Sequence, residues 1–362
     1  MRIALVHYSA PPVIGGVERV LAQQADTLMK HGHQLVIVCE NKGAKVNGAI
    51  MEFAPNFYIK RVRAAIAGCQ VVMVHNMFTM PFNWGGSETL AEISRDTADT
   101  RFINWVHDVD VTPEAFAALQ LKAEHVAVSE VRRREFSEKL SVPLKQCRIV
   151  PNGVDVAATL GLTPKVAAFA VAHRLLEREM ILFQPTRILA RKNIEMGVEI
   201  TGALRKQGVD AVCIVTGAPD PHRQESVDYD AMIRALIVKR KLQDSVLFAA
   251  TKSEVTEEDV RGLYAIADGL IFPSKAEGFG LPLLEAPLHR VPVFCSDIPA
   301  HRELAGKTAI FFKLTDKPEI AAATIAKVLG KDHAGVLKRE VVRRFGWDHI
   351  YKQYLEPLLQ GG

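Results

Sequence analysis

The chain has 362 residues, enough for two ordinary domains, and its 48% of hydrophobic residues can fill two cores. Acidic and basic residues nearly balance at a formal net charge of +4, which argues against a protein that binds nucleic acid by neutralising many phosphates. Five scattered cysteines show neither metal-ligand nor disulfide spacing, as expected of a protein from a reducing cytoplasm.

Short apolar runs rich in Val and Ile alternate with helix-length amphipathic stretches along the whole chain. Such continuous runs are typical of parallel strands buried on both faces, so the chain is expected to be α/β with two doubly wound domains. A Pro-Asn-Gly turn at 151–153 is the expected join. The expected strands are 2–8, 34–39, 70–75, 101–107, 125–129 and 147–150, followed by 180–187, 211–217, 245–250, 269–274, 291–297 and 308–313.

An apolar stripe at helical spacing follows the first strand, and Gly32 is placed to end that helix. Gly15 and Gly16 open it at the end of a strand, where a backbone without side chains can approach a phosphate closely. The pair matches neither the G-x-G-x-x-G fingerprint nor a P-loop. A turn needed only for chain geometry is an equally good interpretation.

The second half opens with cations near a strand end. Arg187 closes the run 180–187, and Lys192 precedes a helix expected from about Ile194 with Asn193 as its N-cap. Two cations at the mouth of a parallel strand can hold a diphosphate. The spacing leaves open whether Arg187 or Arg191 points inward, and solvated surface side chains are the alternative.

The segment SKAEGFGLPLLEA, residues 274–286, combines a turn with a helix start. Pro282 is at the favoured first position of a helix, so the backbone amides around Phe279, Gly280 and Leu281 are expected to be free for phosphate oxygens.

Two acids frame this turn. Glu285 in the first helical turn is explained well by the helix dipole alone, but Glu277 before the turn is not. Two polar connections, 216–230 and 296–304, are further candidates for substrate contacts or ordinary surface loops, and the second carries His301 and Arg302.

Taken together, these motifs resemble the retaining glycosyltransferases of family 4. The segment 274–286, with its two glutamates, is similar to the family's signature. Four other matches occur in the expected order along the chain, followed by a similar closing helix, FGWDHIYKQYLEPLL (345–359). The four are GGVER (15–19), VHD (106–108), PNGVD (151–155) and Arg187-x-x-x-x-Lys192.

The resemblance implies the GT-B fold, with two Rossmann-like domains facing each other across a cleft. Residues 1–152 would form the acceptor-binding domain and residues 153–344 the donor-binding domain. The helix at 345–362 would cross back to the first domain. It also implies a hexosyl transfer with retention, from a nucleotide sugar of the GDP-mannose or UDP-glucose type.

Roles for individual residues follow from the same resemblance. Arg187 and Lys192 would neutralise the donor diphosphate, Glu277 would bind the sugar hydroxyls, and His107 would lie beside the transferred sugar. Asp108 is a candidate for orienting His107. The implied donor-binding residues are Gly15, Gly16, Gly217, Phe279, Gly280, Leu281 and Glu285, the last on the ribose. No metal and no cofactor are expected beyond the nucleotide sugar as co-substrate.

Several alternatives stay open. The chain could instead be a sugar-nucleotide epimerase of related fold, or a catalytically silent partner subunit. The acceptor hydroxyl could belong to a small sugar, a hydroxy acid, a glycan or a lipid-linked sugar. The sequence starts without a signal peptide and has no apolar run of roughly 20 residues, so we expect a cytoplasmic protein. The basic cluster at 60–63 is either a solvated helix face or a peripheral contact with an anionic membrane.

Overall fold

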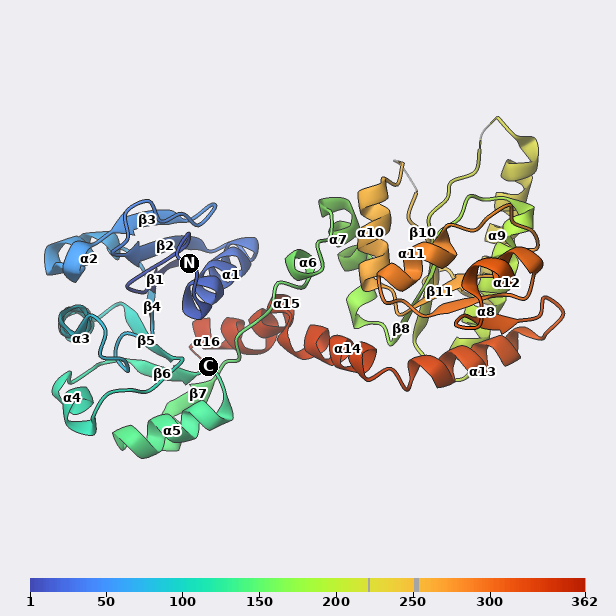
Figure 1. The fold of residues 1–362 in the computed structure, drawn as a ribbon. Helices are drawn as coiled ribbons and strands as arrows, with labels where there is room; N and C mark the ends of the chain where they lie inside the picture. The colour runs from blue at the N-terminus through green and yellow to red at the C-terminus, as the bar shows by residue number, and fades with distance from the viewer. Residues whose placement is uncertain (221, 251–253, 362) are drawn as a thin grey trace. The chain divides into compact units, whose positions relative to one another are not determined.

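The computed structural model describes residues 1–220, 222–250 and 254–361, and it divides into two compact units (Figure 1). The first comprises Met1–Asp155 and Arg344–Gly362, and the second comprises Val156–Arg343. Each unit holds a parallel sheet with apolar clusters on both faces. The prediction of two doubly wound, Rossmann-like domains is therefore confirmed.

The sheet of the first unit has the order β3-β2-β1-β4-β5-β6-β7. All six strands expected here are present. β3 was not predicted, because this edge strand pairs on one side only and its sequence, IMEF, has no fully buried residue. The strands are β1 Arg2–Val6, β2 Gln34–Cys39, β3 Ile50–Phe53, β4 Val71–His75, β5 Arg101–Val106, β6 Glu124–Ala127 and β7 Cys147–Ile149.

Helices cover both faces of this sheet. Figure 1 shows α1 on the side opposite α2 and α3. The C-terminal segment packs on the same face as α1, where Trp347, Ile350 and Leu355 join its apolar cluster. The α1 face is covered by α1 Gly16–Lys30, α15 Trp347–Ile350, the π-helical turn Tyr351–Leu355 and α16 Glu356–Leu359. The other face is covered by α2 Ile59–Ala65, α3 Trp84–Asp96, α4 Pro113–Ala118 and α5 Glu130–Leu140.

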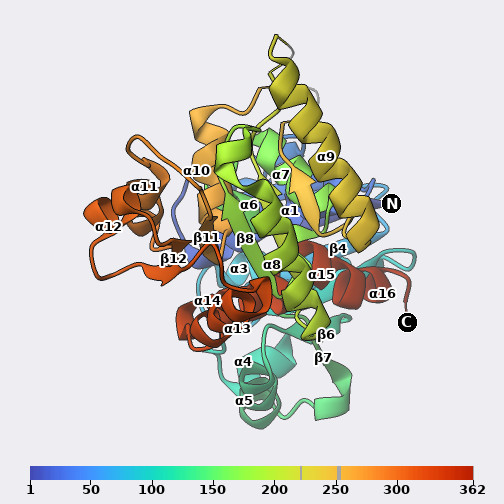
Figure 2. The same cartoon turned by 90° about the vertical axis from the view of Figure 1, so that its right-hand side faces the viewer.

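The sheet of the second unit has the order β10-β9-β8-β11-β12-β13, and all six expected strands are present. On one face α8 packs between α9 and α13, as Figure 2 shows. The strands are β8 Met180–Gln184, β9 Ala211–Val215, β10 Val246–Phe248, β11 Gly269–Phe272, β12 Val293–Ser296 and β13 Ile310–Phe312. The helices are α6 Val156–Thr159, α7 Pro164–Ala172, α8 Ile194–Lys206, α9 Gln224–Arg240, α10 Glu257–Ile266, α11 Pro282–Leu288, α12 Pro299–Ala305, α13 Pro318–Leu329 and α14 His333–Phe345.

Each sheet has a point where the chain reverses its direction of winding. In the first unit it lies between β1 and β4, and in the second between β8 and β11. At such a point the loops that leave the two carboxyl ends run to opposite faces, which opens a crevice for ligands. The loops that carry most of the predicted site residues follow these strands.

The connection after β9 is shorter than expected. Helix α9 begins at Gln224, so the connection spans 216–223 rather than 216–230, and its residue 221 lies outside the described residues. Ser226 Oγ donates to the carbonyl of Ile188 at 2.8 Å, and Tyr229 Oη accepts from the amide of Ile194 at 2.9 Å. These bonds hold the first turns of α9 against the loop that follows β8.

All five cysteines are buried as free thiols, as their scattered positions suggested. Within residues 1–220, 222–250 and 254–361, no helix combines the length and apolar character that crossing a bilayer requires.

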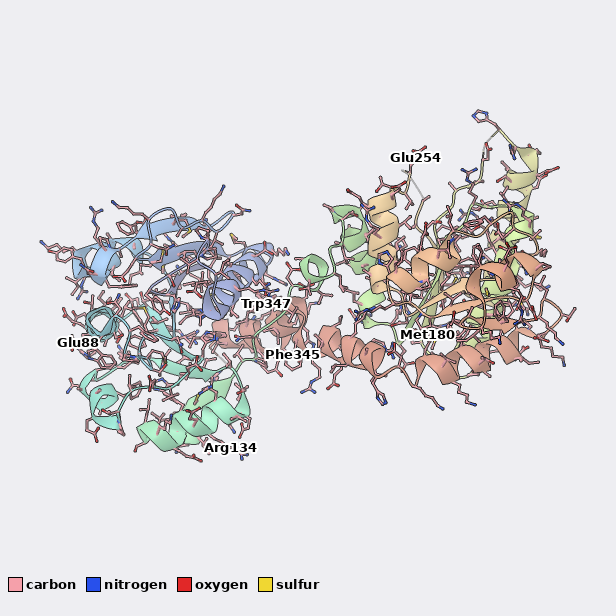
Figure 3. All side chains as sticks on the ribbon, viewed as in Figure 1. Glu88, Arg134, Met180, Glu254, Phe345 and Trp347 are labelled. Atoms are coloured by element: carbon pink, nitrogen blue, oxygen red, sulfur yellow. The ribbon has the colours of Figure 1, made fainter. Side chains whose placement is uncertain are left out.

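The return of the C-terminal segment depends on a close contact at Gly153. Trp347, labelled in Figure 3, is 6% exposed, and its Nε1 donates to Gln23 Oε1 at 2.9 Å. A Cβ on Gly153 would lie 2.3 Å from the indole ring, and the next residue, Val154, forms a bridge with Gly346. Gly153 therefore leaves the space that Trp347 fills.

We expect Gly153→Ala to displace Trp347 and to lower the free energy of unfolding of the first unit by about 1–3 kcal/mol, the usual cost of overpacking. Denaturant unfolding followed by tryptophan fluorescence measures this. Gly85→Ala, in α3 with nothing within 4 Å of the added Cβ, is the matched control and is expected to be neutral or slightly stabilising. Equal stability of the two variants would contradict the packing role of Gly153.

Candidate functional site

The loops that follow β8 and β11 are tied together at the winding reversal of the second unit. The amide of Lys275 donates to the carbonyl of Arg191 at 2.8 Å, and Asn193 Nδ2 donates to the carbonyl of Pro273 at 3.0 Å. Asn193 takes a left-handed backbone conformation with φ of 54° and makes no side-chain cap bond. Asn193 thus occupies the N-cap position, as predicted, but its side chain joins the two loops instead of capping the helix.

Glu277 lies at the centre of these loops. Its side chain is only 5% exposed, and its carboxylate accepts hydrogen bonds from three side chains. Lys192 Nζ and Ser274 Oγ approach Oε1 at 2.5 and 2.7 Å, and Arg191 NH1 approaches Oε2 at 3.0 Å. The structure therefore brings together Lys192 and Glu277, two of the predicted site residues.

The charges of this cluster follow from its contacts. Burial works to raise the pKa of Glu277, but the hydrogen bonds from Lys192 and Ser274 and the charge of Lys192 outweigh burial and hold that pKa below its ordinary value. Glu277 is thus an ionised carboxylate at neutral pH. With Lys192 and Arg191 both cationic, the cluster keeps an excess of one positive charge.

Arg187 lies at the same edge of the sheet but outside this cluster. Its side chain is exposed, and among the described residues no hydrogen bond or ion pair holds it. The arginine that contacts Glu277 is Arg191, a choice that spacing left open.

Gly217 supports the backbone at Arg187. A Cβ at Gly217 would lie 2.4 Å from the carbonyl oxygen of Thr186 and 2.7 Å from the Cα of Arg187. Thr216 Oγ1 also accepts a hydrogen bond from the amide of Thr186 at 2.9 Å. Gly217 therefore allows the loops after β8 and β9 to be in contact. This contact fixes the position of the Arg187 backbone, from which its side chain extends.

The turn before α11 presents free donors. Gly280 has φ of 105°, a conformation that strongly favours glycine, and Phe279 and Leu281 are more than half exposed. Within the part of the chain that the structure describes, the amides of Phe279, Gly280 and Leu281 have no hydrogen-bond partner. The start of α11 at Pro282 matches the prediction.

Glu285 lies in the first turn of α11 and does not join the Glu277 cluster. Its Oε2 accepts a hydrogen bond from the hydroxyl of Tyr264 at 3.0 Å. Among the residues that the structure describes, no other side-chain hydrogen bond of Glu285 is formed, so its second oxygen can accept from a ligand hydroxyl.

His301 and Arg302 have different surroundings. His301 is fully buried, and its Nδ1 lies 2.9 Å from the carbonyl oxygen of Ser296, whose hydroxyl donates to the carbonyl of Ser274. It thus supports the loop that carries Glu277. Arg302 forms a two-point ion pair with Asp297, and its guanidinium lies over the ring of Phe311. Its positive charge is therefore compensated within the second unit.

At the winding reversal of the first unit, Gly15 precedes α1 and Gly16 is its first residue. Gly16 is open, with nothing within 4 Å of an added Cβ, whereas a Cβ on Gly15 would strike the carboxylate of Glu18. Glu18 is 6% exposed, and its Oε1 accepts from Ser9 Oγ at 2.5 Å. Glu18 was not predicted, and it holds the loop from Ser9 to Gly15 in place.

His107 lies in a row of buried histidines. Its Nε2 is 3.1 Å from Nδ1 of His75, and Nδ1 of His7 lies 2.8 Å from the carbonyl oxygen of His75. Asp108 does not orient His107, because its carboxylate pairs with Arg132 at 3.1 Å. Asn76 instead accepts from the amides of both His107 and Asp108.

The sequence motifs did not single out His7 and His75, although a signal was present. The expected strands RIALVHY, QVVMVH and RFINWVH each contain the dipeptide Val-His at the carboxyl end. His7 is level with His75, and His107 lies two residues beyond the partner of His75, Trp105, so all three side chains point to one face. The recurrence therefore predicts a cluster once the strands are known to be neighbours.

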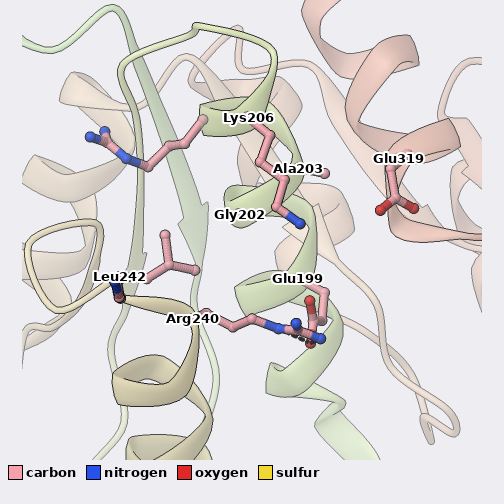
Figure 4. Close-up of a pocket in the computed structure, with 9 residues that line it drawn as sticks. Glu199, Gly202, Ala203, Lys206, Arg240, Leu242 and Glu319 are labelled. Carbon is pink, nitrogen blue, oxygen red and sulfur yellow. Dashed lines mark hydrogen bonds and ion pairs between the residues drawn. The ribbon is translucent and has the colours of Figure 1, made fainter.

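A separate surface pocket of about 230 Å³ lies at the C-terminal ends of α8 and α9 (Figure 4). The candidate site lies near the N-terminal ends of these helices. In the pocket, Arg240 is paired with Glu199 at 2.7 Å. We assign it no role.

Two family models match the chain. The model "Glycosyltransferase Family 4" matches residues 14–158, and the model "Glycosyl transferases group 1" matches residues 168–342. Each match falls largely within one of the two units, and together they cover most of the chain.

The related proteins are either of low sequence identity or match only part of this chain. The O-antigen chain mannosyltransferase RfbU of Salmonella typhimurium is 34% identical over 90 residues, which are 25% of this chain and 25% of that protein. The mannosylglucosylglycerate synthase of Thermotoga maritima is 20% identical over 357 residues, covering 81% of this chain and 80% of that protein. The chain thus matches about a quarter of the length of the first relative.

Among solved structures, Anabaena Alr3699/HepE in complex with UDP is 18% identical, covers 99% of this chain and 100% of its own, and has a TM-score of 0.42. A TM-score of this size is too low to support a conclusion about this chain. The two family models, in the order that the sequence motifs predicted, carry the assignment. The chain belongs to the family 4 glycosyltransferases.

Proposed function

We propose that the protein transfers a hexose from a nucleotide sugar to an acceptor hydroxyl, with retention at the anomeric carbon. The observation that carries the proposal is the cluster at the carboxyl edge of β8 and β11, where Lys192 and Arg191 surround Glu277 beside the free amides of residues 279–281. A diphosphate and its sugar need such a combination of cations, amides and a hydroxyl acceptor.

In this proposal the second unit binds the donor. Lys192 and Arg187 neutralise the diphosphate, and the amides of Gly280 and Leu281 add dipoles aimed at its oxygens. Glu285 accepts from the ribose and Glu277 from the sugar. The first unit binds the acceptor, and Gly16 and His107 are the residues of this unit that we propose to contact substrate.

The chemistry proposed is departure of the nucleoside diphosphate as the bond from the anomeric carbon to the phosphate oxygen breaks. Negative charge grows on that oxygen, and the fixed cations and amides stabilise it without having to reorganise. The acceptor hydroxyl attacks on the departing side, and a phosphate oxygen takes its proton. Glu277 positions the sugar and forms no covalent bond, because its carboxylate is held by three donors. No metal is needed in this scheme, since protein cations carry the compensating charge.

We infer a mannosyl donor, GDP-mannose, from the names of relatives. RfbU and the GDP-mannose:cellobiosyl-diphosphopolyprenol alpha-mannosyltransferase of Xanthomonas oryzae are mannosyltransferases by name, and the relative from Thermotoga maritima is named as the synthase of a mannosyl compound. The acceptor is a sugar or a glycan, either free or linked to a lipid.

A donor-by-acceptor screen tests the function. Purified protein is incubated with GDP-mannose or UDP-glucose, alone and with sugar, glycan or lipid-linked acceptors, and the products are separated and their anomeric configuration read by NMR. We expect a new glycoside with the α-configuration of GDP-mannose. A new nucleotide sugar without acceptor would indicate an epimerase, and no product together with no thermal stabilisation by GDP, UDP or ADP would indicate a silent subunit. A nucleotide at 100 times its dissociation constant should add about 2.7 kcal/mol of stability.

We expect Lys192→Ala and Arg187→Ala each to reduce kcat by about 100- to 1000-fold, the usual loss of about 2.7–4 kcal/mol when one group that stabilises transition-state charge is removed. Steady-state kinetics measures the loss. Lys275→Ala is the matched control, because Lys275 lies in the neighbouring loop but its side chain pairs with Glu195 at 2.7 Å. Full turnover by Lys192→Ala would refute the assignment.

We expect Gly217→Ala to act through Arg187. The new Cβ displaces the backbone at Thr186 and Arg187, and the misplaced guanidinium should lower kcat/KM by about 10- to 100-fold. A double-mutant cycle separates this from general damage: in the Arg187→Ala background, Gly217→Ala should cause little further loss. Fully additive losses would show that Gly217 acts independently of Arg187.

A further inference from the structure

Three neighbouring strands of the first unit bring histidines to one place. The sheet order places β1, β4 and β5 side by side, and Val6 is in register with Val74. His7 is therefore level with His75, whereas His75 is in register with Trp105, so His107 lies two residues further along the chain of β5. All three side chains lie on the face covered by α1. The side chains two residues earlier on these strands, Leu5, Met73 and Trp105, belong to the apolar cluster of that face.

The hydrogen bonds define the proton on His7. Its Nδ1 lies 2.8 Å from the carbonyl oxygen of His75, and a carbonyl can only accept, so Nδ1 of His7 carries the proton. The contact between His75 Nδ1 and His107 Nε2, at 3.1 Å, is different, because either nitrogen can donate to the other.

Both rings of that contact are neutral. Burial, together with the nearby His7 ring and the positive charge of Arg132, lowers the pKa of His107 to about 3. Burial also lowers the pKa of His75, which is fully enclosed against the ring of Trp105. One of the two nitrogens must therefore be a donor and the other a bare acceptor.

The remaining nitrogen of His75 decides between the two arrangements. Its Nε2 is buried and has no hydrogen-bond partner among the described residues. If His107 donated, His75 Nε2 would have to carry a proton and would be a buried N–H without an acceptor. If His75 donates, its Nε2 is a bare acceptor. Orphaned N–H groups are rarer in proteins than unsatisfied acceptors, so the second arrangement is favoured.

We propose that His75 is a positioning residue that donates from Nδ1 to Nε2 of His107 and so holds His107 in its Nδ1–H form. His107 then offers a hydrogen-bond donor to a ligand oxygen, such as a sugar hydroxyl, and does not serve as a base. The sugar as ligand rests on the proposed function. The tautomer is a property of the unliganded protein.

Nitrogen NMR of the unliganded protein tests the tautomer directly. The twelve histidines are labelled with ¹⁵N, and the signals of His107 are assigned by their loss in His107→Ala. Long-range proton–nitrogen couplings are expected to show Nδ1 protonated and Nε2 bare. A protonated Nε2 in the wild-type protein overturns the inference, whether or not the protein transfers a sugar.

Variants of His75 test whether this residue sets the tautomer of His107 and whether that tautomer affects catalysis. His75→Leu removes the donor, so His107 should shift toward the Nε2–H form that free neutral histidine favours, and kcat should fall roughly 5- to 10-fold, the worth of one hydrogen bond. His75→Asn supplies an amide N–H in place of Nδ1 and should restore both the tautomer and most of kcat. Equal losses in the Leu and Asn variants would overturn the positioning role.

His125→Leu is the matched control. His125 is a partly buried histidine of the same sheet, but its ring lies 5.1 Å from that of Phe136 and its Nδ1 lies near Asn104. Its loss should leave the signals of His107 unchanged. A shift of the His107 signals in this variant would mean that they report general loosening of the sheet, and the inference would fail.

Discussion

The buried carboxylate of Glu277 requires hydrogen-bond donors, and this requirement determines how the loops after β8 and β11 of the second unit are arranged. At 5% exposure its charge would be costly without partners, and three donors from the loops after β8 and β11 satisfy it. Those donors are then fixed in turn: Lys192 is held at the sheet edge, and Arg191 also reaches the carbonyl of Ala276. The geometry of the cations is therefore set before any ligand arrives.

This arrangement has a consequence for anion binding. Lys192 is only 14% exposed and is already paired, so little side-chain entropy remains to be lost when it meets a phosphate. The excess positive charge of the cluster, together with Arg187, leaves an electropositive edge beside the open amides of residues 279–281. Preorganised charge of this kind is the main means by which proteins stabilise a departing anion.

The corresponding edge of the first unit is built differently. Beside the carboxylate of Glu18, it carries three neutral imidazoles, because burial lowers the pKa of His7, His75 and His107. Neutral donors and acceptors suit hydroxyl groups, whereas the cations of the second unit suit phosphates. The chemical contrast between the two edges is consistent with the proposal that the first unit binds a hydroxyl acceptor and the second unit binds a diphosphate donor.

The sequence by itself determined the strands, the class of each domain and the local turns. Twelve strands could be predicted because strands buried on both faces have continuous apolar sequences. β3 could not be predicted because it is an edge strand and lacks that pattern. The turn at Gly280 and the helix starts at Gly16 and Pro282 were equally local, since they depend on backbone conformations that particular residues favour. Tertiary structure alone decided that Arg191 rather than Arg187 contacts Glu277, that Asn193 bridges two loops, and that His7 and His75 stand beside His107. These contacts join residues far apart in the chain, and they depend on which strands become neighbours, an order that no local stretch of sequence encodes.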